Sequence, residues 1–292
     1  MDLKQLRYFL AVAEEGQLTA AAQKLHITQP PLSYQLAALE RELGTTLLER
    51  GPRGVRLTEA GELLRARASQ ILELASSAAR ELENFDKGLQ GTLAIGTISS
   101  SGGVVPNRHM LAFTREHPNV RFEIHEGNSF EVIDMLERGV IDLGVVRTPF
   151  QAAGLECRYA QPEPMMALVP PGHRCGEQGD SVSLEELQGQ PLILYRRFEA
   201  LLRQVFGQHG LTPTLYCVND DARTTMAWAG AGFGIGIVPQ SALLMPADDG
   251  LVRKAIRCEE LATRLAVIWM GKRYLSPLAR AFVELFQDTI LQ

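Results

Sequence analysis

Apolar residues near the N-terminus recur at helical spacing and predict a first helix of about 12 residues, which Gly16 ends. An alanine-rich helical stretch follows at residues 18–25. A tight turn at His26 and Ile27 leads into a third helix, for which Thr28 is placed as the N-cap. Two short helices joined by a tight turn form a helix-turn-helix. The apolar positions of the first helix are Leu3, Leu6, Phe9, Leu10 and Ala13.

The third helix has an apolar stripe of its own, and Gly44 ends it. Prolines at positions 30 and 31 fit its first turn, because N–H groups there have no partner within the helix. The stripe predicts a buried face made of Leu32, Leu36, Leu39 and Leu43.

Residues 45–57 predict a β-hairpin. Two short β-like runs flank Gly51-Pro52-Arg53-Gly54, which is typical of a turn. A hairpin after a helix-turn-helix indicates the winged form of that motif. This wing carries three arginines, Arg50, Arg53 and Arg56.

A long helix is predicted from about residue 59 to 87, with Thr58 as its cap. Its apolar residues alternate steps of four and three, the heptad pattern of paired helices. We expect this stripe to form a dimer seam rather than to pack on a globular core; an ordinary amphipathic helix packed within its own chain is the alternative. The stripe consists of Leu64, Ala68, Ile71, Ala75, Ala78, Leu82 and Phe85.

The pattern changes at Gly91. Short buried-type strands at 92–96, 120–125 and 141–146 alternate with helical stretches, and the same alternation recurs between residues 191 and 238. A last strand at 265–270 precedes a helix at 276–291. Such alternation predicts parallel α/β sheets. The predicted fold class is therefore α plus α/β: a winged helix-turn-helix, a long linker helix and two α/β lobes.

Composition narrows the class of protein. With 46% hydrophobic and 22% charged residues in a chain of 292, it is typical of a soluble globular protein. The net charge of −5 does not indicate a nucleic-acid partner, and residues 1–88 hold 11 basic and 12 acidic side chains. Any affinity for DNA must therefore come from a local basic patch.

The cysteines and the first residues restrict location and chemistry. Cys157, Cys175, Cys217 and Cys258 are widely spaced, with no Cys-x-x-Cys pair, so the spacing suggests neither a zinc site nor a disulfide scaffold. The first residues lack the basic and then apolar pattern of a secretion signal. The expectation is a cytoplasmic protein with reduced thiols.

A series of short segments resembles the LysR-type family of bacterial transcriptional regulators over essentially the whole chain. In the N-terminal part they are LRYFLAVAE (6–14), LTAAA (18–22), TQPPLS (28–33), LE (39–40), LG (43–44), LLER (47–50) and LTEAG (57–61). In the C-terminal part they are GVIDLG (139–144) and GAGFGIGIVP (230–239). This ordered set is more specific than a generic helix-turn-helix.

The resemblance implies three parts. They are a DNA-binding winged helix-turn-helix at 1–58, a linker and dimerisation helix at 59–88, and an effector-binding domain at 89–292. The family's effector domain resembles the two-lobed periplasmic solute-binding proteins. We place lobe I at about 91–160 and 265–292, and lobe II at about 161–264.

For DNA, the second helix of the motif would enter the major groove and present its first residues to base edges. Glutamine pairs with adenine, hydroxyls reach bases or phosphates, and wing arginines meet phosphate or a minor groove. The family often has a basic residue where Tyr34 stands, so a shifted specificity is expected; Gln29 and the two threonines have helix-start and capping roles as alternatives. The predicted residues are Thr19, Thr28, Gln29, Pro30, Ser33, Tyr34, Gln35, Arg50, Arg53 and Arg56.

Two-lobed α/β domains bind small molecules between the lobes, outside the carboxyl ends of strands. Hydroxyls and N–H groups at helix N-termini favour an anion, and an arginine can pair with a carboxylate through two hydrogen bonds. We expect a small organic anion, a carboxylate, as effector and no cofactor, with Ser99 and Ser100 most important by resemblance. The predicted residues are Ser99, Ser100, Ser101, Asn128, Ser129, Arg147, Tyr195, Arg196 and Arg197.

The expected partners are double-stranded DNA, the small effector, a second copy of the chain in dimers that pair into tetramers, and RNA polymerase. One alternative keeps the regulator but makes the signal redox, with Cys175 and Cys217 as the candidate thiols. A solute-binding protein would lack residues 1–88. An enzyme is disfavoured because the serine cluster has no nucleophile-elbow pattern and no histidine spaced to serve it.

Overall fold

The computed structural model describes the chain except residues 52–53, 86–88, 174, 177–178, 245–249 and 290–292. Two compact units make up the chain. The first comprises residues 1–82 together with 138–140, and the second comprises residues 83–137 and 141–292.

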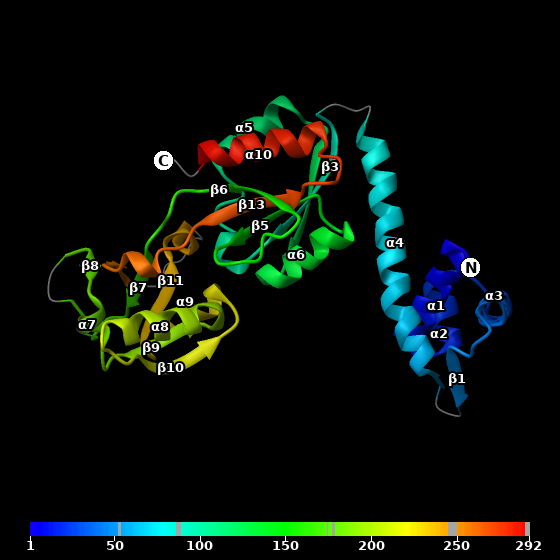
Figure 1. Ribbon diagram of the computed structural model, residues 1–292, viewed down its shortest axis with the longest axis horizontal. Coiled ribbons are helices and arrows are strands. Elements are labelled where there is room, and N and C mark those ends of the chain that lie inside the picture. The colour runs from blue at the N-terminus through cyan, green and yellow to red at the C-terminus, as the bar shows by residue number, and fades with distance from the viewer. Residues whose placement is uncertain (52–53, 86–88, 174, 177–178, 245–249, 290–292) are drawn as a thin grey trace. The chain divides into compact units, whose positions relative to one another are not determined.

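The first unit is a winged helix-turn-helix followed by a long helix (Figure 1). Its core is apolar and joins all three helices of the motif to the wing, with Phe9, Leu32 and Leu36 among its most buried members. The elements are α1 (Leu3–Glu15), α2 (Leu18–Lys24), α3 (Gln29–Leu43), β1 (Leu48–Gly51), β2 (Gly54–Leu57) and α4 (Glu59–Phe85).

Local signals fix the ends of these helices. Gly16 and Gly44 follow α1 and α3 with φ of 64° and 67°, the left-handed conformation in which glycine carries no steric penalty. Leu36 and Leu39 are buried as predicted, but Leu43 is 39% exposed. The last turn of α3 has therefore left the core, and the prediction for Leu43 was wrong.

The joint between wing and α4 depends on Thr58 and Gly61. The Thr58 hydroxyl accepts a hydrogen bond from the Gly61 N–H at 3.0 Å and donates to the Thr46 carbonyl at 2.7 Å. A Cβ on Gly61 would lie 2.2 Å from the Leu47 carbonyl oxygen, so only glycine permits this approach. The first turns of α4 consequently lie on the winged-helix core.

This packing corrects the expected dimer seam. Ala68 is buried and Leu64 packs against the same core, so these two positions stabilise the unit itself. Further along, Ile71, Ala78 and Leu82 are exposed and Ala75 is half-buried, whereas the Phe85 side chain lies outside the described residues. Only the later part of the stripe is open to a partner helix.

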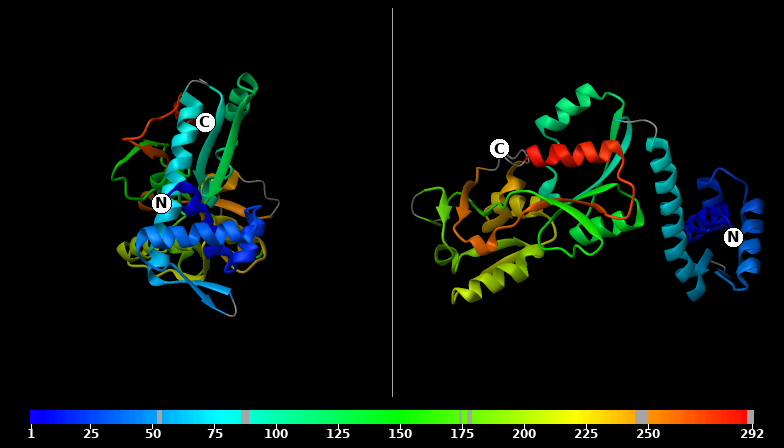
Figure 2. Two further views of the ribbon diagram at one scale, coloured as in Figure 1. Left: turned by 90° about the vertical axis from the view of Figure 1, so that its right-hand side faces the viewer. Right: turned by 45° about the horizontal axis from the view of Figure 1, so that its top comes forward.

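The second unit contains two sheets. The first, in lobe I, has the strand order β4-β3-β5-β13-β6, with β3, β4 and β5 parallel. Helices α5 and α10 pack together on one face of this sheet, and α6 covers the other (Figures 1 and 2). The elements are β3 (Gly91–Thr97), η1 (Ser99–Ser101), α5 (Arg108–Glu116), β4 (Val120–Glu126), α6 (Ser129–Arg138), β5 (Leu143–Arg147), β6 (Leu155–Tyr159), β13 (Leu265–Met270) and α10 (Pro277–Thr289).

The second sheet, in lobe II, has the order β10-β9-β11-β7-β12-β8, with β10, β9 and β11 parallel. Helix α9 packs on β9 and β11. The elements are β7 (Met165–Val169), β8 (Ser181–Val182), α7 (Leu184–Leu187), β9 (Pro191–Tyr195), η2 (Arg196–Phe198), α8 (Glu199–Gln208), β10 (Thr214–Asn219), α9 (Ala222–Gly230), β11 (Ile235–Pro239), η3 (Gln240–Leu244), β12 (Val252–Ile256) and η4 (Glu259–Leu261).

The chain crosses between the lobes twice, and the two crossings pair with each other. Glu163 and Thr263 form an antiparallel bridge, with N–H to carbonyl distances of 2.8 and 3.0 Å. In sequence, lobe II is therefore inserted between β6 and β13 of lobe I. Two paired, antiparallel segments connect the lobes. Among the described residues, none of the helices combines the length and the apolar character that crossing a membrane requires.

Candidate functional site

The N-terminal end of α3 presents a row of solvent-facing side chains. Thr28, Gln29 and Pro30 are exposed, and Tyr34, one turn further on, is 66% exposed. Thr28 occupies the N-cap position but its side chain makes no capping hydrogen bond. The helix therefore does not use the Thr28 hydroxyl, and a capping role does not account for a threonine at this position.

Three further predicted positions lie around this row. Thr19 on α2 is exposed. Ser33 is half-buried, and Gln35 is half-buried with its side-chain oxygen accepting a hydrogen bond from Gln5 on α1 at 3.4 Å. Gln35 thus takes part in packing α3 on α1, a role that the sequence did not indicate.

The wing is a short antiparallel pair in which Glu49 lies opposite Arg56. The Val55 N–H donates to the Gly16 carbonyl at 2.7 Å, which ties the hairpin to the end of α1. Arg56 is exposed. Arg53 and the Arg50 side chain lie outside the described residues, so the predicted arginine patch is described at Arg56 alone.

Glu40 positions the wing, a role that the sequence pattern does not indicate. Its Oε1 accepts hydrogen bonds from the Leu47 and Leu48 N–H groups at 2.8 and 3.1 Å. A carboxylate that accepts two backbone N–H groups makes stronger bonds than a neutral acceptor does. The glutamate thereby joins α3 to the start of β1.

Replacing Glu40 by alanine is expected to destabilise the first unit by about 2 kcal/mol, because two charge-assisted hydrogen bonds are lost at a half-buried site. Hydrogen exchange at the Leu47 and Leu48 amides measures the effect directly, since both lose their acceptor. The matched control is Glu40→Gln, which keeps an acceptor oxygen and should retain most of the protection. Equal protection in wild type and Glu40→Ala would contradict this role.

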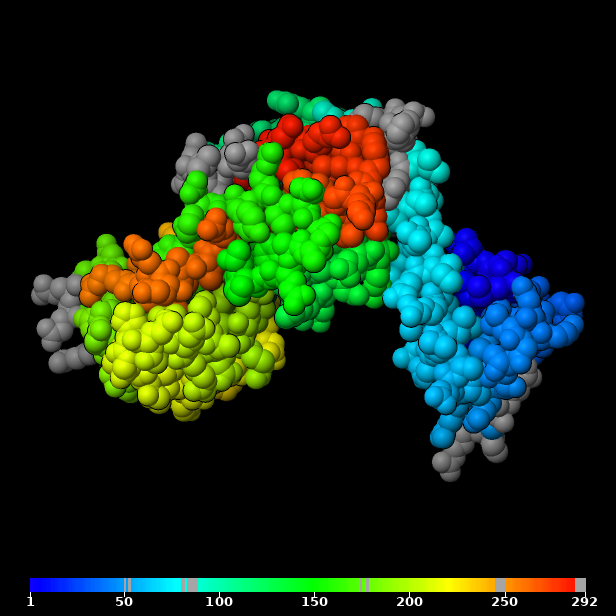
Figure 3. Space-filling model, in the orientation of Figure 1, coloured from blue at the N-terminus to red at the C-terminus, as the bar shows by residue number. Residues whose placement is uncertain are grey.

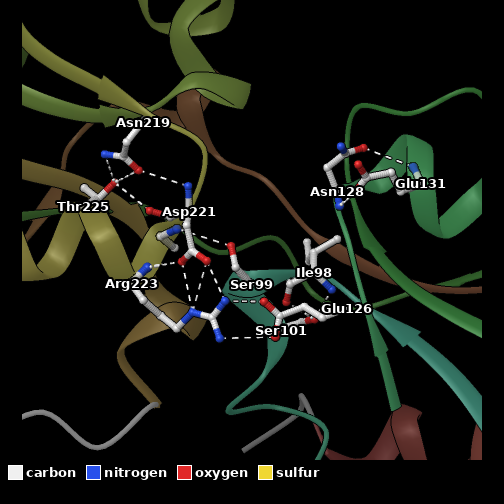
Figure 4. Close-up of polar contacts among 11 residues, drawn as sticks. Ile98, Ser99, Ser101, Glu126, Asn128, Glu131, Asn219, Asp221, Arg223 and Thr225 are labelled. Carbon is white, nitrogen blue, oxygen red and sulfur yellow. Dashed lines mark hydrogen bonds and ion pairs between the residues drawn. The ribbon is translucent and has the colours of Figure 1, made fainter. Parts of the chain in front are cut away.

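In the second unit, polar residues from both lobes meet at the carboxyl ends of the parallel strands. Ser99, after β3 in lobe I, accepts a hydrogen bond through its Oγ from the Ala222 N–H, the first N–H of α9 in lobe II, at 3.3 Å. Arg223 on the same helix donates to Glu126 at the end of β4 and to Asp221 (Figure 4). The positive end of α9 therefore faces Ser99.

Two predicted effector residues satisfy their own local backbone instead. The Ser101 hydroxyl bonds to the N–H and the carbonyl of Ile98, at 3.2 and 2.9 Å. The Asn128 side chain accepts from the Phe130 and Glu131 N–H groups at the start of α6. Figure 4 shows Asn128 and Glu131 apart from the cluster around Ser99. These two side chains build turns in this structure, and their role in effector binding stays a prediction.

A fully buried arginine links the two crossings to both lobes. Arg147, at the end of β5, donates to Ser100 at 3.3 Å, to Ser241 at 2.5 Å, to Thr263 at 3.0 Å and to Glu163. Burial lowers the pKa of Arg147, and the Glu163 carboxylate opposes that shift. We refer to these five residues as the Arg147 cluster. Ser100 belongs to it and is 0% exposed, so in this structure its hydroxyl is engaged by Arg147, and its role as a ligand contact stays a prediction.

The two adjacent arginines after β9 point in different directions. Arg196 is exposed and pairs with Asp220 at 2.7 Å, so in this structure its guanidinium is engaged at the surface, and its role in effector binding stays a prediction. Arg197 instead donates to the Ser129 hydroxyl at 2.7 Å, to the Pro149 carbonyl at 3.1 Å and to the Arg147 carbonyl. It therefore connects lobe II to lobe I.

The charge of Arg197 is not balanced by any of these contacts. Within the described part of the chain, its hydrogen bonds go to a hydroxyl and two carbonyls, and its Nε is buried with no partner. Burial, with a smaller contribution from the charge of Arg147, lowers the pKa of Arg197 to about 10. Tyr195 lies beside it and beside Ser99, and burial raises the pKa of the Tyr195 phenol.

Sequence reasoning missed several members of this region. Glu163 and Thr263 lie at the lobe crossings, whereas Asp221 and Ser241 follow the ends of β10 and β11. The rule that selected Ser99 and Tyr195, namely polar residues just past a parallel strand, would also have found Asp221 and Ser241. The crossing residues carry no such signal, because their partners are distant in sequence.

The proposed redox pair is separated by the sheet. Cys217 is on edge strand β10, whereas Cys175 donates to the Glu186 carbonyl of α7 and lies near Lys254 of β12. Four strand spacings separate β10 from β12, roughly 19 Å, far beyond the reach of a disulfide. Burial also raises the pKa of Cys157, Cys175 and Cys258, which favours the unreactive thiol form.

Comparison with known proteins identifies both units. Residues 3–62 match the family described as "Bacterial regulatory helix-turn-helix protein, lysR family", and residues 86–290 match the "LysR substrate binding domain". The uncharacterized HTH-type transcriptional regulator YnfL of Escherichia coli is 33% identical over 292 residues, which cover 97% of this chain and 96% of that protein.

Solved structures agree with this result. The crystal structure of CbnR, a LysR family transcriptional regulator, has a TM-score of 0.80 at 27% identity, with 100% of both chains covered. Full-length CbnR in complex with its target DNA has a TM-score of 0.61 at 28% identity, covering 99% of this chain and 100% of that one.

Proposed function

The chain belongs to the LysR family of bacterial transcriptional regulators, and from this premise we propose that its regulatory signal is a small organic carboxylate bound between the two α/β lobes. It is a DNA-binding transcriptional regulator with an effector-binding domain, not an enzyme. Membership of this family does not define the chemistry of the effector.

The observation that carries this proposal is the uncompensated charge of Arg197. A half-buried cation without a carboxylate partner costs free energy, and an anion that pairs with it reduces that cost. The Nε N–H has no partner among the described residues, and a carboxylate oxygen is a charge-assisted acceptor for it. The N-terminal end of α9 beside Ser99 adds a favourable potential for the same charge.

Ser99, Ser129 and Tyr195 complete the proposed site. The Ser129 hydroxyl already bonds to Arg197, and Ser99 contacts both Tyr195 and the first turn of α9. Because these residues come from both lobes, a ligand that contacts them binds one relative arrangement of the lobes more tightly than another. Such differential affinity is what allows a ligand to shift a conformational equilibrium.

A thermal-shift screen tests the proposal. Small carboxylic acids are compared with their primary amides, which have nearly the same shape and no charge. Both tryptophans, Trp228 and Trp269, lie in the second unit, so tryptophan fluorescence reports on that unit. A carboxylate that binds raises the transition temperature by mass action, whereas its amide does not. Equal shifts from acid and amide would argue against an anion site.

On DNA, we propose that the exposed row at the start of α3 enters the major groove and that the wing lies along the phosphates. The exposed later part of the α4 stripe, Ile71, Ala78 and Leu82, would pair with the same helix of a second copy. Dimers would then place two recognition helices on two half-sites, with pairing of dimers into tetramers as a further step. The role implies action in the cytoplasm, on DNA and together with RNA polymerase.

Replacing Arg56 by alanine is expected to weaken binding to all DNA sequences alike and to reduce the slope of log K against log salt by about 0.9 per subunit, because one phosphate contact is lost. Arg115 is exposed on α5 and supplies the matched control, since Arg115→Ala removes the same charge outside the DNA-binding unit. A slope that is equal in Arg56→Ala and in wild type would exclude the phosphate contact.

A further inference from the structure

A second cluster of chemically active side chains lies in lobe II, apart from the effector site. His209 follows the last residue of α8, and Cys258 and Glu260 lie at the start of η4. Helix α8 packs against η4, which brings together residues that are separated by about fifty positions in sequence. In the space-filling view, the segment that contains η4 (orange) lies against that of α8 (yellow-green; Figure 3).

The three ligand atoms are close enough to share one ion. One nitrogen of His209, the Cys258 sulfur and one carboxylate oxygen of Glu260 all lie within 4.8 Å of one another. The Cys258 thiol donates to Glu260 Oε2 at 3.2 Å, and His209 Nε2 is 3.9 Å from Glu260 Oε1. In a tetrahedral zinc site, bonds of 2.0–2.3 Å place ligand atoms about 3.4–3.6 Å apart. The cluster is within side-chain adjustment of that geometry.

The surroundings leave room for an ion and its remaining ligands. The three residues line a hollow of about 960 Å³, together with Glu163, Glu259 and Ala262 among others. The neighbouring cation, Arg257, is engaged with Ser181 and Glu186. A thiolate and a carboxylate would together balance the charge of a divalent ion, and open volume beside them accommodates a water ligand.

We propose that His209, Cys258 and Glu260 bind a divalent metal ion of the zinc class. Sulfur and imidazole ligands together select a borderline ion over magnesium or calcium, which prefer oxygen ligands. Three protein ligands plus solvent form an incomplete shell, as in zinc sites that keep an open position. The bond to the metal replaces the thiol proton of Cys258, which is released to solvent on binding.

The position of the site gives metal binding a structural consequence. Glu260 lies three residues before Thr263, which pairs with Glu163 at the lobe crossing and belongs to the Arg147 cluster. Glu163 itself lines the same hollow. A metal ion would tie η4 to α8, and so hold the chain that enters the second crossing. Metal would therefore slow hydrogen exchange in residues 258–263.

The test is a titration of the full chain, free of any affinity tag, with Co²⁺ as a spectroscopic probe. One equivalent of Co²⁺ is expected to bind and to give a thiolate-to-cobalt charge-transfer absorption, which Zn²⁺ then displaces. The variant Cys258→Ser should lose this absorption, and His209→Gln should bind Co²⁺ at least tenfold more weakly. The matched control is Cys217→Ser, a half-buried cysteine on β10, which should behave as wild type.

Two results would overturn the proposal. The first is an unchanged charge-transfer absorption in Cys258→Ser, which would assign the thiolate to another cysteine. The second is no binding of Co²⁺ or Zn²⁺ by a reduced wild-type chain. Circular dichroism without metal tests whether each variant folds, a control that the cysteine variants need because Cys217 and Cys258 pack half-buried against the core of lobe II. The outcome is independent of the carboxylate site, which contains none of the three residues.

Discussion

Replacing Arg147 by methionine is expected to destabilise the second unit by about 3–5 kcal/mol. The arginine is 0% exposed, and its guanidinium satisfies Ser100, Glu163, Ser241 and Thr263 at once. Removing it leaves the Glu163 carboxylate at the lobe crossing without its cation, which is the costly part of the change. The measurement is urea unfolding followed by the fluorescence of Trp228 and Trp269.

Two variants separate this effect from a general loss of positive charge. Arg196→Met removes an exposed arginine that pairs with Asp220, and it should leave the stability nearly unchanged, because solvent screens this ion pair. Adding Glu163→Gln to Arg147→Met should restore part of the lost stability, because the unpaired charge is then absent. A loss in Arg147→Met no greater than in Arg196→Met would refute the central role of the Arg147 cluster.

Replacing Arg197 by glutamine is expected to weaken binding of the carboxylate effector about 100-fold, since a charge-assisted pair in a partly desolvated site is lost. DNA affinity without effector should stay the same, because Arg197 lies in the other unit. Isothermal titration with the best acid from the screen measures the loss. Arg196→Gln, one residue away and exposed, is the matched control and should bind normally.

A second readout distinguishes a ligand role from a structural one. Burial lowers the pKa of Arg197 from its ordinary value to about 10 in the folded chain, so folding disfavours its charged form. This cost is fully present below pH 10 and diminishes as the pH rises from there toward the ordinary pKa of arginine. Without effector, Arg197→Gln should therefore be at least as stable as wild type at neutral pH. A marked loss of stability would show that its hydrogen bonds to lobe I outweigh the cost of its charge, and would make its role structural rather than one of binding the effector.

Much of the fold was predictable because its signals are local. Helix ends at Gly16 and Gly44, the cap at Thr58 and the alternation of strands and helices after Gly91 are all set by neighbours in sequence. The structure deviates where tertiary contact overrides pattern. Leu43 leaves the core, and the start of the α4 stripe packs on the winged helix because Gly61 allows a close approach to Leu47.

The same division holds for the candidate effector site. The rule that polar residues just past parallel strands share a site grouped Ser99, Tyr195 and Arg197 from the sequence alone. It could not tell Arg197 from Arg196, because the choice depends on Ser129 and Asp220, which are far away in sequence. Nor could it show that Ser101 and Asn128 satisfy their own turns, or that Ser100 is enclosed in the Arg147 cluster.

The sequence by itself determined that this protein is a winged helix-turn-helix regulator with a two-lobed α/β domain, since ordered motifs and periodicity depend on local propensity and on which face is apolar. Only the tertiary structure decided which charges are buried and which cysteine lies beside other side chains that can bind a metal ion. Cysteine spacing gave no sign of a metal site, whereas the packing of η4 on α8 brings His209, Cys258 and Glu260 together. The physical reason is that desolvation and coordination depend on distances between side chains, which the fold sets through contacts remote in sequence.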